Sequence, residues 1–173
     1  MKWINRCMVV LGLLFIPMIA EAKNELLGTV AGTFNDESRE FYAIADNFGE
    51  RSSSFMKLGN AINFTVEAYA DRQRPYSSAT ITIEFSVKGN PPEPGPQVSD
   101  LDITYRSESG IFPYYSDEEA TFELSIVEIR FDAGSAFIKA NFTADLVLVE
   151  GPPKKIVGDR MAVTGSFEVE ARK

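Results

Sequence analysis

The chain has 173 residues, a net charge of −8 at pH 7, one cysteine and no histidine. Nucleic acid and anionic lipid bind stripes of Lys and Arg, so this acidic composition argues against both as partners. The lack of imidazole excludes His-based triads, Cys–His nucleophiles and zinc hydrolases, each of which needs His as base or ligand.

The first 22 residues have the pattern of a secretory signal peptide. Lys2 and Arg6 supply the positive start, residues 8–19 form an apolar run, and Ala20 and Ala22 offer a small-residue cleavage site. The run would make about 18 Å of helix, against the roughly 30 Å of a bilayer core. We therefore expect residues 1–22 to be removed, leaving a periplasmic or secreted bacterial protein without a membrane span.

Residues 23–173 are expected to form one domain without disulfides. Cys7 leaves with the predicted leader, and so does Trp3. A chain of the remaining length buries enough surface to fold without covalent staples.

Period-two alternation predicts about nine strands. Ile81, Ile83, Phe85 and Val87, for example, would share a buried face. In residues 140–148 the same alternation predicts that Leu148 is buried and Val147 is exposed. The expected strands are residues 27–34, 40–45, 53–58, 62–69, 80–87, 100–107, 121–131, 140–148 and 163–170.

Three interruptions in this pattern have structural meaning. The apolar parity slips at Ile126–Val127, which predicts a β-bulge. The segment 132–135 reads as a hairpin loop, while the proline-rich segment 89–96 cannot pair in a ladder. Because such features turn a chain from one sheet to another, the sequence favours an antiparallel β-sandwich, with a closed β-barrel as the alternative.

The first candidate binding surface is an aromatic loop between predicted strands. Phe112, Tyr114 and Tyr115 combine rigid apolar area with phenolic hydroxyls, which suits a contact surface. The same side chains could instead plug the open end of the fold.

A basic turn is the second candidate. Arg72, Arg74 and Tyr76 make a local positive site in an acidic chain, able to meet a carboxylate or phosphate.

Metal and cofactor signals are weak. Asp117, Glu118 and Glu119 are the main calcium candidates, because Ca²⁺ takes oxygen ligands, but they lack the spacing of an EF-hand loop. The sequence favours solvated acidic turns over a calcium site, and no cofactor is predicted.

The sequence favours a non-catalytic function. Glutamates on the predicted strands, such as Glu84 and Glu123, fall on the solvent parity, where a carboxyl group has little reason for a shifted pKa. We expect an exported protein that binds a protein or a glycan. The alternative is a lipocalin-like carrier of a lipid or other hydrophobic small molecule, although Gly32-Thr33-Phe34 lacks the Trp of that family's Gly-x-Trp motif.

Overall fold

The computed structural model describes residues 24–46, 50–89, 97–107 and 113–173. The predicted leader, Phe112 and most of the proline-rich segment lie outside these residues. Nine strands and one short 3-10 helix make up the described chain. They are β1 (Glu25–Phe34), β2 (Glu37–Ala45), β3 (Ser53–Leu58), β4 (Ala61–Tyr69), η1 (Pro75–Ser77), β5 (Thr80–Lys88), β6 (Val98–Arg106), β7 (Tyr114–Phe131), β8 (Ser135–Glu150) and β9 (Lys155–Arg172).

The strands form one sheet whose pairing closes into a ring. Neighbours along the chain pair antiparallel from β3 to β9, and β1 pairs with both β2 and β9. Two single bridges complete the circuit, Tyr42 with Tyr69 between β2 and β4 and Ser54 with Arg172 between β3 and β9. The predicted antiparallel all-β fold is confirmed.

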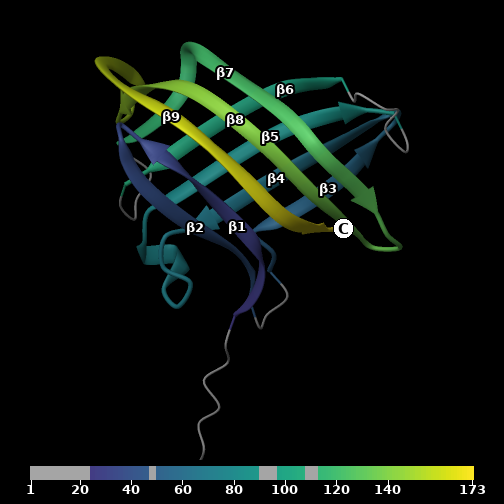
Figure 1. Ribbon diagram of the computed structural model, residues 1–173. Coiled ribbons are helices and arrows are strands. Elements are labelled where there is room, and N and C mark those ends of the chain that lie inside the picture. The colour runs from purple at the N-terminus through teal and green to yellow at the C-terminus, as the bar shows by residue number, and fades with distance from the viewer. Residues whose placement is uncertain (1–23, 47–49, 90–96, 108–112) are drawn as a thin grey trace, which may run out of the picture.

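The ring has two facing layers. Figure 1 shows β7, β8, β9 and β1 on the near side, with β6, β5, β4 and β3 behind them. The arrangement therefore combines the layers of a sandwich with the continuous pairing of a barrel.

Side chains from both layers fill the space between them. Six phenylalanines and Tyr105 are almost fully buried, and Phe64 stacks on Phe85 with ring centroids 5.1 Å apart. Apolar burial of this kind is the main favourable contribution to folding. The buried aromatic rings are Phe34, Phe41, Phe64, Phe85, Tyr105, Phe142 and Phe167.

Most of the predicted faces are confirmed, but Ser86 and Tyr69, predicted on the solvent face, are buried, and the alternation fails near the end of β8. Ile81, Ile83, Phe85 and Val87 all point into the core. In β8 the sequence placed Leu148 inside and Val147 outside. Instead Val147 is buried and Leu148 is half-buried, because a register shift between them re-phases the strand against β9.

The predicted bulge in β7 and the predicted hairpin loop at 132–135 are both present. The β7–β8 register shifts between Ile126 and Glu128, which confirms the bulge, and the Asp132 amide donates to the Ser135 carbonyl across the predicted hairpin. The β1–β2 connection is the two-residue turn Asn35–Asp36, both with positive φ, as a type I′ hairpin requires.

Within the residues described here, no helix has the length and apolar character needed to cross a bilayer.

Candidate functional site

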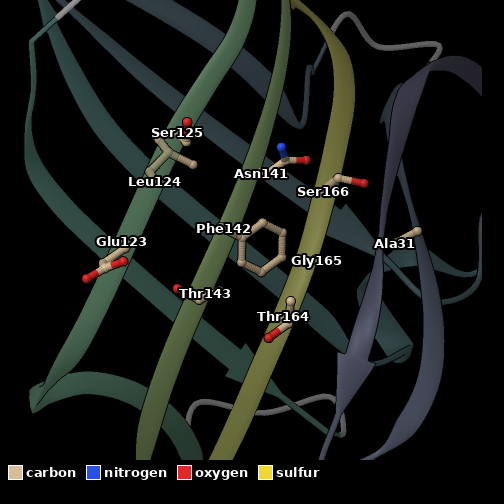
Figure 2. A pocket seen from close by; sticks show the side chains of 10 residues that line it. All are labelled: Ala31, Glu123, Leu124, Ser125, Asn141, Phe142, Thr143, Thr164, Gly165 and Ser166. Atoms are coloured by element: carbon tan, nitrogen blue, oxygen red, sulfur yellow. The ribbon is translucent and has the colours of Figure 1, made fainter.

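A depression with a volume of about 480 Å³ lies on the outer face of four neighbouring strands. Figure 2 shows β7, β8 and β9 side by side, with β1 beyond them and Ala31 at that end of the depression. We call it the polar groove. Its lining residues are Ala31, Glu123, Leu124, Ser125, Asn141, Phe142, Thr143, Thr164, Gly165 and Ser166.

Strand register arranges the polar side chains of the groove in two rows. The first row joins Ser125, Asn141 and Ser166, which occupy paired positions and are all exposed. The second row contains the exposed residues Glu123, Thr143 and Thr164, also at paired positions. Strands lie about 4.8 Å apart, so three spacings from β7 to β1 span about 14 Å. The two rows therefore present hydroxyl, amide and carboxylate groups on the exposed surface of the groove.

Glycines allow β1 and β9 to approach closely along one side of the groove. A Cβ on Gly32 would lie 2.4 Å from the Thr164 carbonyl oxygen, and one on Gly165 would lie 2.6 Å from the Ala31 carbonyl oxygen. Both positions are too crowded for any side chain. The Phe142 ring covers the inner side of Gly165, where a Cβ would meet its Cζ at 2.7 Å. The core thus supports the groove from below.

The lining chemistry points to a polar, uncharged ligand. None of the ten lining residues is Lys or Arg, and Glu123 carries the one charge among them. Phosphates and carboxylates would need basic partners. Hydroxyls and amides both donate and accept hydrogen bonds, which matches the hydroxyl groups of a sugar.

The predicted aromatic loop is only partly a loop. The sequence placed Tyr114 and Tyr115 outside the strands, but β7 begins at Tyr114 because these residues pair with Val149 and Leu148 of β8. Tyr114 is 8% exposed and lies near the cations of Arg106 and Lys154. Tyr115 is half-buried, with its ring centroid 6.3 Å from that of Tyr105. Both rings thus pack largely against the fold itself.

The predicted basic turn is held by local contacts. The Arg72 guanidinium donates to the carbonyl of Asn24, at 2.6 Å from its Nη2, and Arg74 pairs with Asp71 at 3.0 Å. The Asp71 carboxylate also accepts backbone N–H groups of this turn, which together with Arg74 lowers its pKa. The positive charges are therefore largely satisfied within the turn.

Tyr76 is the exposed member of this turn. Its side chain is 65% exposed, and its hydroxyl lies 3.2 Å from Glu50 and 3.5 Å from Asp46. Partial burial, followed by these carboxylates, raises its pKa. The structure thus places Tyr76 against acidic groups.

The acidic calcium candidates have protein partners where they are described. Asp117 Oδ1 accepts the backbone N–H of Ile103 at 3.3 Å, and Glu118 pairs with Lys154 at 2.5 Å. The side chain of Glu119 lies outside the described part. In the portion of the chain that the structure covers, no group of three or more acidic residues is arranged to hold a metal ion.

An arginine that the sequence did not single out covers one end of the core. Arg39 of β2 pairs with Gly32, so its side chain has room to lie over the rings of Phe34 and Tyr105. It also donates to the Tyr105 hydroxyl and pairs with Glu37 at 2.8 Å. This end of the interior is closed by a cation stacked on aromatic rings.

Comparison with known families, characterised proteins and solved structures finds no match to this chain.

Proposed function

We propose that the chain is an exported, non-catalytic binding protein and that its polar groove binds a glycan. One observation carries this proposal: the depression of about 480 Å³ is lined by two rows of exposed hydroxyl and amide side chains without a basic residue. Sugar recognition needs many such groups with donor and acceptor capacity at fixed positions. Strands hold them more firmly than loops would.

The filled interior favours this proposal over a lipocalin-like carrier. A carrier needs an apolar cavity inside the fold. Here the space between the layers holds aromatic side chains such as Phe64, Phe85 and Phe167, and the rings of Phe85 and Phe167 lie 6.2 Å apart. The described depressions open instead to the outside.

The absence of histidine supports a non-catalytic function. The groove contains one carboxylate, Glu123, whereas glycoside hydrolysis in most families uses a pair of carboxyl groups about 5–9.5 Å apart. The groove residues are suited to holding a sugar chain rather than to cleaving it.

Binding of soluble oligosaccharides tests the proposal directly. We would titrate the ¹⁵N-labelled protein with hexamers of glucose and of N-acetylglucosamine in separate experiments. The largest NMR chemical-shift changes should occur at the backbone amides of Asn141 and Ser166. Ser166→Arg should weaken binding by at least about tenfold, because one long side chain fills the groove.

Ser38→Arg is the matched control. Ser38 is an exposed serine on β2, outside the groove lining, so the same substitution there should leave binding unchanged. Binding that Ser166→Arg does not weaken would overturn the assignment of the groove. Hydrolysis of either oligosaccharide would overturn the non-catalytic assignment.

A further inference from the structure

The ring of strands is incompletely paired between β6 and β7. In the described chain, these strands pair only at Thr104 with Ser116 and at Tyr105 with Tyr115. Figure 1 shows them meeting near the left of the view and diverging toward the right. On its other edge, β6 pairs with β5 from Val98 to Arg106. Residues 121–131 of β7 likewise pair with β8 on their other edge. In the described chain, residues 98–103 of β6 and residues 121–131 of β7 therefore have no partner strand on the edges that face each other, and we call these two edges the β6–β7 seam.

The inner face of β7 is only partly covered along this seam. Leu124 is half-buried, whereas its paired neighbour Phe142 on β8 is buried. On β6, Val98 and Leu101 are half-buried as well. The half-buried apolar residues of β7 are Phe122, Leu124, Ile126, Ile129 and Phe131. An added strand with alternating apolar side chains would cover this row.

Charge along the seam is predominantly negative. Asp100 and Asp102 are exposed on β6, and Glu123 and Glu128 are exposed on β7, where Arg130 pairs with Glu128 at 2.7 Å. Partial burial and the carboxylates of Asp117, Glu84 and Glu118 raise the pKa of Asp102, despite the opposing charge of Lys154. The seam therefore favours a basic occupant.

A second copy of the chain fits the seam less well than a basic peptide. Each copy carries a net charge of −8. Like-charged carboxylates would face one another across such a contact.

We infer that the β6–β7 seam binds an extended peptide that adds as a strand to residues 121–131 of β7, with apolar side chains directed inward and basic side chains outward. The backbone edge supplies the hydrogen bonds, the row around Leu124 selects apolar residues at every second position, and Asp102 selects positive charge. This site adjoins the polar groove and shares Glu123 and Leu124 with it, but it uses the backbone edge of β7 that faces β6, whereas the groove extends from β7 across β8 and β9 to β1.

Three synthetic peptides of nine residues test the inference. The first alternates Val with Lys and Thr, the second has Glu in place of Lys, and the third repeats the first with N-methylated backbone amides. Binding is followed by fluorescence anisotropy and by hydrogen exchange on the purified protein. The first peptide should bind at least about tenfold more tightly than either of the others, since it alone has both charge and backbone complementarity.

Hydrogen exchange locates the bound peptide. Exchange should slow in residues 121–131 and stay unchanged in β3. Asp102→Lys should weaken binding of the basic peptide by at least about tenfold, whereas Asp159→Lys should have little effect, because Asp159 is an exposed residue of β9.

Three results would overturn the inference. One is equal binding of the N-methylated peptide, since strand addition depends on backbone hydrogen bonds. Another is protection confined to residues outside the seam. The last is a concentration-dependent dimer, seen by analytical ultracentrifugation, that protects residues 121–131 without any peptide and shows that a second copy covers the edge.

Discussion

β7 and β8 are neighbours with nearly the same alternation of apolar and polar residues, yet their surroundings differ. β8 pairs with β7 on one side and with β9 on the other along most of its length, and its inner residues from Ala136 to Leu146 are buried. In the described chain, residues 121–131 of β7 pair only with β8, and their inner side chains are half-buried. Alternation therefore identifies the inner face of a strand, but pairing on both edges decides how completely that face is covered.

Among the substitutions considered, the largest loss of folding stability is expected in β8. Leu146→Ala removes a side chain that is 0% exposed and should lower the free energy of unfolding by about 3–5 kcal/mol, from lost burial and the cavity left behind. Urea unfolding followed by circular dichroism measures this loss. A loss below about 1 kcal/mol would show that the site collapses or is already solvated.

The same substitution in β7 sharpens the comparison. Leu124→Ala should cost about 1–2 kcal/mol, because its side chain is only half-buried and leaves no enclosed cavity. The matched residue type makes the ratio of the two losses informative. Equal losses for Leu124→Ala and Leu146→Ala would contradict the difference in coverage.

A smaller change in stability, this time a gain, is expected from a substitution on β6 beside the seam. Asp102 has a raised pKa, so folding favours its protonated form, and its charge destabilises the fold above that pKa. Asp102→Asn should therefore raise the melting temperature at pH 7. The gain should disappear below about pH 4, where the wild-type carboxyl is protonated in both states. A gain that does not change with pH would point to hydrogen bonding instead.

The smallest effect is expected at the bulge of β7. Val127 is 55% exposed, and it has no partner in the β7–β8 register as described. Val127→Thr keeps the β-branched shape and should change the free energy of unfolding by less than about 0.5 kcal/mol. A larger loss in thermal unfolding would mean that Val127 packs against another part of the molecule.

The sequence alone predicts most of this fold. Patterns such as Ile81, Ile83 and Phe85 identify strands and faces because a half-buried strand has no other way to arrange its side chains. The sequence-based prediction was wrong at Val147, because nothing in the amino-acid composition there signals the local register shift. It was also wrong at Tyr114, because aromatic residues beside a proline resemble a loop.

The polar groove was not foreseen, although its residues were visible on the solvent parity. Asn141 and Thr143 belong to one strand, and Thr164 and Ser166 to another. Their meeting depends on the β8–β9 register, and the depth of the groove depends on the approach of β1 to β9 at Gly165. Both are tertiary properties that periodicity does not specify.

The pairing of β1 with β9 has a consequence for how the chain folds. It joins residues as distant as Gly28 and Val169, and the Asn35 amide donates to the Ala162 carbonyl at 2.9 Å to extend the same contact. Contacts of such large sequence separation close slowly, so we expect refolding on the order of milliseconds to seconds. A growing chain cannot complete its ring until the last strand has been made. Until then the edges of β1 and β8 stay unpaired, and that interval is when the protein is most exposed to aggregation and proteolysis.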